Sequence, residues 1–244
     1  KEIIMAPAPK FSLEEQEKLI LFAAVTAIEK STLLDFSMSS IAKSAGLSMG
    51  SVYKFVQCKE DLLIALATKM YQEKQKVFSQ VLALPLTTPE RIIALSLLDF
   101  TKVQMYSFDD QLESIVNTCS IMKRSSQRWL DYMFNCCKVC EDSFQALLKA
   151  AVDSKELGSN PSDLEEINVG AWSLSVGYFQ TVRMHHGRSN QQESDGQACV
   201  SSLAVNNVHI LNLQRFLNSF DFQDKLKSED IEKVCRMLVE LKLR

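Results

Sequence analysis

Apolar residues recur every three or four positions along most of this chain, and that period is typical of helices with one buried face. Seven glycines and five prolines among 244 residues leave few of the tight turns that sheets require. Ser12 and Glu15 form a capping box, which is a start signal for the first helix. The pattern predicts an all-α fold. The expected long helices cover residues 13–31, 59–83, 89–106, 108–122, 126–154, 163–186, 198–220 and 229–242.

Two shorter helices are expected within residues 37–60. Ser37 is placed to cap the first of them, because its hydroxyl accepts a backbone N–H that the first turn leaves unpaired. Gly46 follows where that helix should end in a left-handed residue, and Ser48 is placed to cap the second helix. The inward positions are Ile41, Ala42, Ala45, Val52 and Val56. Two short helices joined by a glycine turn predict a helix-turn-helix unit, which the helix at 13–31 would complete as a three-helix domain.

The same stretch resembles the TetR family of bacterial transcriptional regulators. The resemblance covers roughly residues 12–68, and it implies an N-terminal DNA-binding domain followed by a helical ligand-binding and dimerisation bundle. One departure is that Phe55-Val56 stands where the family commonly has His-Phe. The matching residues are Ile41-Ala42, Ala45-Gly46, Ser48, Gly50, Tyr53, Val56, Lys59-Glu60 and Leu62-Leu63.

The second helix of the unit should project Met49, Ser51, Tyr53, Lys54 and Phe55, since residues at the N-terminal end of a recognition helix face base edges. Residues 37–59 contain no acidic side chain, which favours contact with phosphate. The alternative is an ordinary helical hairpin whose serines and lysines are solvated and bind no DNA. The predicted DNA-binding residues are Ser37, Ser39, Ser48, Met49, Ser51, Tyr53, Lys54 and Lys59, of which Lys59 resembles the family's phosphate clamp.

Charge and cysteine usage narrow the class of protein. The net charge is −3, so the acid-free segment is locally basic on an acidic chain. Seven cysteines is an odd number for a disulfide framework, and none has a paired zinc spacing. No apolar run approaches the length of a membrane span. We therefore expect a reduced, cytoplasmic, nucleoid-associated protein with no metal, no cofactor and no membrane partner.

The second half of the chain is rich in aromatic and thioether side chains. These residues predict an apolar effector pocket between helices, although each one alone is typical of a core. Cys136, Cys137 and Cys140 follow the apolar stripe of one helix, so core packing is favoured over a redox or metal role. The predicted pocket residues are Phe100, Trp129, Tyr132, Met133, Cys136, Trp172 and Phe179.

The helix at 163–186 is apolar on more than one side, so it needs a partner beyond its own core. The family resemblance implies a homodimer through this helix and the one at 198–220. The expected domains are residues 1–58 for DNA binding, 59–83 as a connecting helix, and 84–244 for the effector and dimerisation.

Together these observations predict a ligand-responsive transcriptional regulator. It would be a repressor that binds a palindromic operator as a dimer and is released by a small apolar effector. No catalytic motif is present, so we expect no enzymatic activity. Two alternatives stay open: a helical small-molecule-binding or thiol-based enzyme domain whose helix-turn-helix reads no DNA, and a helical protein–protein adaptor.

Overall fold

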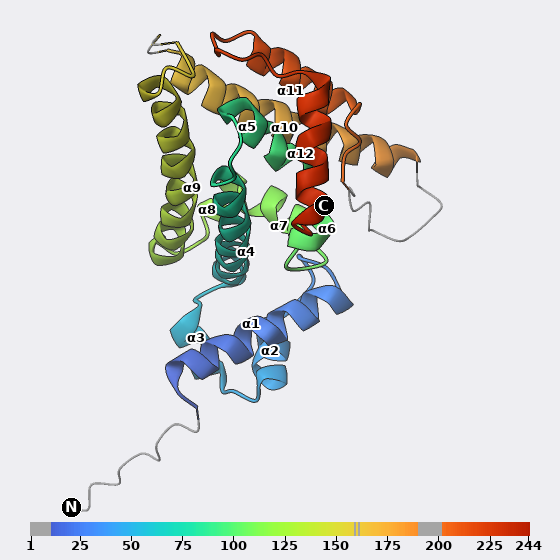
Figure 1. Cartoon of the computed structure of the whole chain (residues 1–244). Coiled ribbons are helices and arrows are strands. Elements are labelled where there is room, and N and C mark those ends of the chain that lie inside the picture. The colour runs from blue at the N-terminus through green and yellow to red at the C-terminus, as the bar shows by residue number, and fades with distance from the viewer. Residues whose placement is uncertain (1–10, 159, 161, 190–201) are drawn as a thin grey trace, which may run out of the picture. The chain divides into compact units, whose positions relative to one another are not determined.

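The computed structural model describes residues 11–158, 160, 162–189 and 202–244. Within them the chain forms α-helices and no β-strand, with an isolated bridge between Leu157 and Phe222. The all-α prediction is confirmed (Figure 1). The helices are α1 (Leu13–Lys30), α2 (Met38–Ala45), α3 (Met49–Phe55), α4 (Lys59–Leu82), α5 (Thr88–Leu97), α6 (Phe100–Val103), α7 (Asp109–Val116), α8 (Cys119–Met122), α9 (Gln127–Asp153), α10 (Asp163–Ser189), α11 (Val208–Asn218) and α12 (Ser228–Glu240).

The chain divides into two compact units. The first comprises the described part of Lys1–Tyr71 together with Met105–Cys136, and the second comprises Gln72–Gln104 together with Cys137–Arg244. The unit that carries the predicted helix-turn-helix therefore also includes α7, α8 and the first turns of α9. Both α4 and α9 begin in the first unit and end in the second.

In the first unit, α1 packs against α2 and α3 (Figure 1). The capping box at the start of α1 is present: Ser12 Oγ accepts the Glu15 N–H at 3.2 Å, and Glu15 Oε2 accepts the Ser12 N–H at 2.7 Å. The inward residues expected for the two short helices are all buried. The sequence pattern thus predicted correctly which faces of the two short helices contribute to this core.

The helix-turn-helix also has the expected terminal residues. Ser37 and Ser48 cap α2 and α3, and each side chain accepts a backbone N–H three residues ahead, from Ser40 and Ser51 at 3.1 Å. Gly46 has φ 66° and ψ 29°, which is the left-handed conformation. It turns the chain sharply enough for α3 to start three residues later, at Met49.

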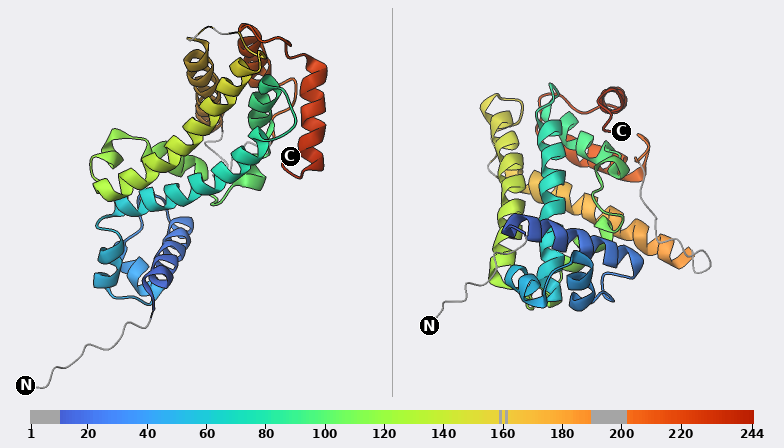
Figure 2. Two further views of the ribbon diagram at one scale, coloured as in Figure 1. Left: turned by 60° about the vertical axis from the view of Figure 1, so that its left-hand side comes forward. Right: turned by 90° about the horizontal axis from the view of Figure 1, so that it is seen from below.

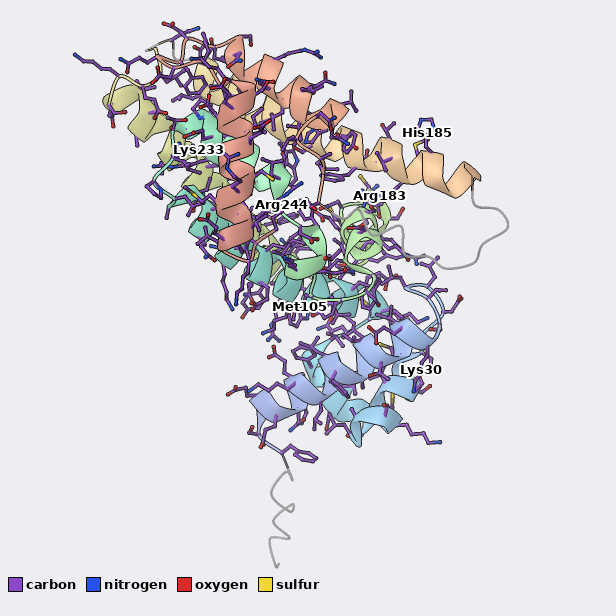
Figure 3. All side chains as sticks on the ribbon, turned by 45° about the vertical axis from the view of Figure 1, so that its right-hand side comes forward. Lys30, Met105, Arg183, His185, Lys233 and Arg244 are labelled. Carbon is purple, nitrogen blue, oxygen red and sulfur yellow. The ribbon has the colours of Figure 1, made fainter. Side chains whose placement is uncertain are left out.

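The second unit is built from α5, α6, α10, α11 and α12 with the C-terminal parts of α4 and α9, which lie side by side in Figure 2. Lys233 of α12 pairs with the buried carboxylate of Glu90 at 3.0 Å. The guanidinium of Arg244, which Figure 3 labels, donates to the carbonyls of Leu97 and Leu203, both at 2.7 Å. These contacts hold the C-terminal helix on α5. The core of the second unit includes Ile93, Leu97, Leu148, Ile167, Ile210, Leu213, Val234 and Leu238.

Two predicted helices are broken, and both breaks occur at N-capping residues. The helix expected at 89–106 is α5 and α6, separated at Leu98 and Asp99, where the Asp99 side chain accepts the Thr101 N–H at 3.0 Å. The helix expected at 108–122 is α7 and α8, and Thr118 caps the latter. An aspartate or threonine inside an apolar pattern competes for backbone donors and starts a new helix there.

The helix expected at 198–220 is shorter than predicted. Residues 198–201 lie outside the described residues, 202–207 are not helical, and α11 starts at Val208. Asn207 caps α11 by accepting the His209 N–H at 2.8 Å. The long helices predicted at 59–83, 126–154, 163–186 and 229–242 are confirmed to within a few residues at each end.

Candidate nucleic-acid interface

The predicted DNA-binding residues come from the start of α2, from α3 with its N-cap, and from the start of α4. Ser37, Ser39 and Ser48 are exposed, and Ser51 is half-buried. Their hydroxyls form two pairs: Ser37 Oγ lies 3.2 Å from Ser39 Oγ, and Ser48 Oγ lies 3.1 Å from Ser51 Oγ. Ser37 and Ser48 therefore cap their helices and at the same time present hydroxyl groups at the surface.

The outward side of α3 carries the larger side chains. Tyr53 is 48% exposed, Lys54 is exposed, and Met49 is half-buried. Val52 lies on the opposite side and is fully buried. A phenol, an ammonium group and a thioether thus project from the helix that the sequence predicted to read bases. These side-chain types donate hydrogen bonds to bases and phosphates or contact thymine methyl groups.

Lys59 has a more restricted position at the first turn of α4. Its Nζ lies 3.5 Å from the Leu34 carbonyl oxygen and 5.0 Å from the centroid of the Phe36 ring. An ammonium group has three N–H donors, so one bond to Leu34 leaves others for a phosphate. The contact holds Lys59 at the same surface as Ser37, which directly follows Phe36.

Phe55 does not project toward this surface as the sequence suggested. Its ring packs edge-on against Trp129 of α9, with ring centroids 5.0 Å apart, and its carbonyl accepts the Trp129 indole N–H at 3.1 Å. The position where the family commonly carries histidine is therefore used here for packing within the first unit. Sequence reasoning missed this pairing because nothing local connects residues 55 and 129.

The predicted pocket residues fall into different units. Trp129, Tyr132, Met133 and Cys136 belong to the first unit, whereas Phe100, Trp172 and Phe179 belong to the second. Trp129, Met133 and Cys136 are buried, but Tyr132 is 52% exposed and Trp172 is 60% exposed. A pocket formed by all seven residues stays a prediction.

Within the second unit, two of those residues join an aromatic cluster around His209. The Phe179 ring lies 5.4 Å from Phe100 and 6.0 Å from His209, and the Tyr178 ring stacks on His209 at 4.9 Å. His209 Nε2 lies 3.2 Å from the Ser96 hydroxyl. Burial lowers the pKa of His209, so the neutral imidazole is favoured. The apolar stripe around residue 209 was the only sequence signal for this buried histidine.

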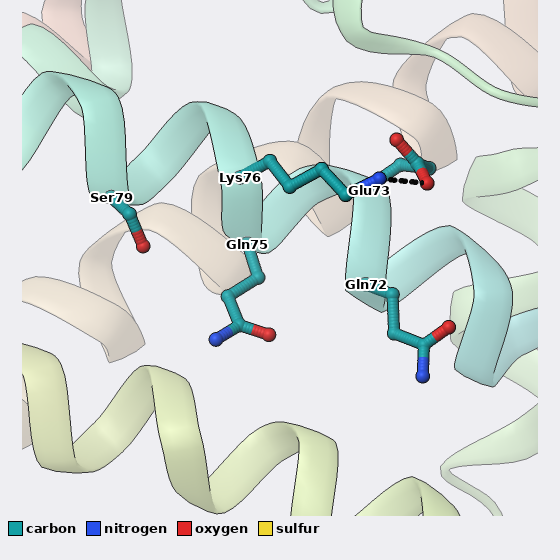
Figure 4. Close-up of a pocket in the computed structure, with 5 residues that line it drawn as sticks. All are labelled: Gln72, Glu73, Gln75, Lys76 and Ser79. Atoms are coloured by element: carbon teal, nitrogen blue, oxygen red, sulfur yellow. Dashed lines mark hydrogen bonds and ion pairs between the residues drawn. The ribbon is translucent and has the colours of Figure 1, made fainter.

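Two hollows adjoin the C-terminal half of α4. An apolar crevice of about 40 Å³ lies between α4, α5 and α9, and its lining includes Phe78, Leu82, Leu95 and Phe144. It is much smaller than a typical ligand site of roughly 300–1,000 Å³. An open groove of about 560 Å³ runs along α4 and is polar, with an ion pair of 2.6 Å between Lys76 and Glu73 (Figure 4). The groove is lined by Gln72, Glu73, Gln75, Lys76 and Ser79.

Burial disfavours the thiolate at two of the described cysteines. Burial raises the pKa of Cys58 to about 11 and also raises the pKa of Cys136. Because the thiolate is the nucleophile, these shifts disfavour thiol chemistry at both positions. In the part of the chain that the structure describes, no three His, Cys, Asp or Glu side chains gather as metal ligands. No described helix is both long enough and apolar enough to cross a bilayer.

No model of a known protein family matches the chain, and no curated protein matches it. Solved structures do share its fold. FadR from Bacillus subtilis, a transcriptional regulator solved with stearoyl-CoA, is 19% identical over 70% of this chain and 89% of its own, with a TM-score of 0.51. A TetR/AcrR-family regulator from Thermobifida fusca is 16% identical over 95% of this chain and 100% of its own, with a TM-score of 0.50.

A third structure, the TetR-family regulator PfmR from Thermus thermophilus, is 13% identical over 81% of this chain and 96% of its own, with a TM-score of 0.50. At sequence identities this low, the similarity is evidence for a shared fold and for nothing more. The chain has the fold of TetR-family regulators, and the resemblance seen in residues 41–63 is confirmed at that level.

Proposed function

We propose that this chain, which has the fold of TetR-family regulators, is a ligand-responsive transcriptional regulator that binds DNA. The observation that carries the proposal is the outward surface of the helix-turn-helix. Tyr53 and Lys54 project from α3, serine hydroxyls lie at the starts of α2 and α3, and residues 37–59 contain no carboxylate. Such a surface supplies donors for phosphates and base edges without a negative charge to repel the duplex.

A homodimer fits the exposed face of α10. This helix buries Ile167 and Ala171 on its inner side, whereas Val169, Trp172 and Met184 are exposed on other sides. Helices α10 and α11 pack against each other, so two copies of this pair would form a four-helix interface and bury the exposed apolar side chains. A twofold dimer would bind a palindrome whose half-sites lie one DNA turn, roughly 34–36 Å, or a multiple of it apart.

Regulation would follow from the preference of a small apolar effector for one arrangement of the second unit. An effector shifts DNA affinity only by its differential affinity for the two states. If the arrangement without effector binds DNA, the protein is a repressor released by its ligand, working on the chromosome in the cytoplasm. We propose no enzymatic role, and the raised thiol pKa values disfavour a thiol nucleophile at Cys58 and at Cys136.

The experiment that tests this function is selection of bound duplexes from a random DNA pool at about physiological salt, followed by sequencing. We expect a palindrome to be enriched, and its half-site spacing would report the dimer geometry. No enrichment by the folded protein, with or without a cell extract that supplies co-ligands, would refute the proposal.

The salt dependence of binding to the enriched duplex then tests the surface itself. Replacing Lys54 by alanine should reduce the slope of log K against log salt concentration by about 0.9 for each phosphate that the protein no longer neutralises, or about 1.8 per dimer. Lys149→Ala is the matched control, because Lys149 is an exposed lysine of α9 in the second unit. Equal salt slopes for Lys54→Ala and Lys149→Ala would show that Lys54 does not contact phosphate.

A further inference from the structure

The C-terminal end of the recognition helix is capped by a side chain from α9. The last carbonyls of any α-helix lack partners within the helix, and Phe55 is the last residue of α3. Its carbonyl accepts the indole N–H of Trp129 at 3.1 Å, while the two rings pack edge to face at 5.0 Å. Trp129 is only 7% exposed. A donor 74 residues along the chain therefore completes the helix that we propose reads DNA.

The turn that follows α3 is held through Asp61 by Ser126, the residue that directly precedes α9. This carboxylate is fully buried. Its Oδ2 accepts the Gln57 N–H at 2.9 Å and the Ser126 hydroxyl at 3.1 Å, and its Oδ1 accepts the Ser126 N–H at 2.6 Å. Three donors therefore converge on this carboxylate. One carboxylate thus joins the α3–α4 turn to the residue that precedes α9.

Two weaker contacts flank this carboxylate. The Cys58 thiol donates to the Arg124 carbonyl at 3.4 Å, and the Arg124 guanidinium lies 3.2 Å from Glu60 Oε1. Arg124 is largely exposed, so its ion pair contributes little by itself. All these contacts nevertheless join the same two segments, residues 124–129 and residues 55–61.

We propose that Ser126 and Trp129 are positioning residues for DNA reading, a role that rests on the proposed function. Helix α3 has seven residues, and a helix of that length is not stable by itself. Its buried residue Val52 fixes it from one side, whereas its C-terminal end is held by Trp129 and, through the following turn, by Ser126. Base contacts need side chains placed to within about half an ångström. Loosening this end of α3 should therefore weaken sequence reading more than phosphate binding.

The test compares two variants, Trp129→Phe and Ser126→Ala, with one control. Trp129→Phe keeps an aromatic ring but removes the N–H donor. Ser126→Ala removes the hydroxyl bond to Asp61, and Ser143→Ala removes a hydroxyl that bonds only within its own helix, to Val139. Each variant is titrated against the palindromic duplex enriched by the parent protein and against a scrambled duplex of equal length.

We expect Trp129→Phe and Ser126→Ala each to lower affinity for the palindrome by about three- to tenfold, the range set by the loss of one hydrogen bond. Affinity for the scrambled duplex should stay unchanged, and the control variant Ser143→Ala should behave as the parent. Equal losses on the two duplexes would indicate general destabilisation and overturn the positioning role. So would unchanged palindrome affinity in both test variants.

A second measurement is independent of DNA. Hydrogen exchange of the Trp129 indole N–H, followed by NMR in the Trp172→Phe variant, should be slowed relative to a free indole because the bond to Phe55 protects it. Free exchange would overturn the proposed contact whatever the DNA results. If the parent enriches no DNA while the indole is protected, the proposed function fails together with the reading role, although the contact itself stands. Enrichment by the parent with normal binding by the variants would overturn the positioning role alone.

Discussion

Replacing Gly46 by alanine tests the turn on which the helix-turn-helix depends. Gly46 has φ 66° and ψ 29°, a conformation that costs an L-residue about 1–2 kcal/mol. A Cβ placed there would meet no heavy atom within 4 Å, so no steric clash adds to this cost. The entropy that alanine removes from the unfolded chain offsets about 0.4–1 kcal/mol. The expected net loss is therefore about 1 kcal/mol in the free energy of unfolding.

Gly50→Ala is the matched control, because Gly50 lies in the first turn of α3 and its added Cβ would make only an ordinary 3.7 Å contact with Ser48 Oγ. Alanine is preferred over glycine in a helix, so this variant should gain about 0.5 kcal/mol. The probe is Trp129 fluorescence in the Trp172→Phe background, which places the remaining tryptophan in the first unit.

In urea or thermal unfolding at fixed protein concentration, the free energies of unfolding of the two variants should differ by about 1.5 kcal/mol. The Tm of Gly46→Ala should be the lower one, by about 4–8 °C for each kcal/mol in a unit of this size. Equal midpoints for Gly46→Ala and the parent would refute the reasoning from backbone conformation.

The second unit gives two further predictions. Because burial lowers the pKa of His209, the unfolded state binds more protons than the folded state just below pH ~6.5, so stability should fall as the pH drops through this range. His209→Gln should flatten that dependence in unfolding curves measured between about pH 7 and 5, and an unchanged slope would contradict it. Gly170→Ala should destabilise the second unit by about 1–3 kcal/mol, since its Cβ would overlap the Phe216 ring of α11. Normal stability of Gly170→Ala, measured by Trp172 fluorescence in a Trp129→Phe background, would show that the two helices separate easily.

Local chemistry explains which parts of this structure the sequence could predict. The caps at Ser37 and Ser48 and the turn at Gly46 depend on residues within three or four positions, so the pattern predicted them correctly. The break at Asp99 depends partly on a distant partner, because its N–H donates to the Leu243 carbonyl at 3.0 Å. Apolar periodicity identified Trp129 as buried but could not identify what it packs against. A tryptophan on a stripe looks the same whether it faces an effector or caps another helix.

The Ser48 hydroxyl caps α3 and is also proposed to contact DNA, and substitutions can separate these two roles. Its oxygen accepts the Ser51 N–H at 3.1 Å, which satisfies one unpaired donor of α3. Its O–H can donate to a phosphate when the Ser51 hydroxyl supplies the proton of their 3.1 Å contact. Ser48→Ala should lose about 1 kcal/mol of stability and that phosphate contact together. Ser48→Asp keeps an equally good cap but places a negative charge against the duplex, so it should unfold like the parent and bind palindromic DNA at least about tenfold more weakly, as expected for a repulsion of about 1.4 kcal/mol or more. Parent-like DNA affinity in Ser48→Asp, measured at low salt where repulsion is strongest, would place the start of α3 away from the phosphate backbone.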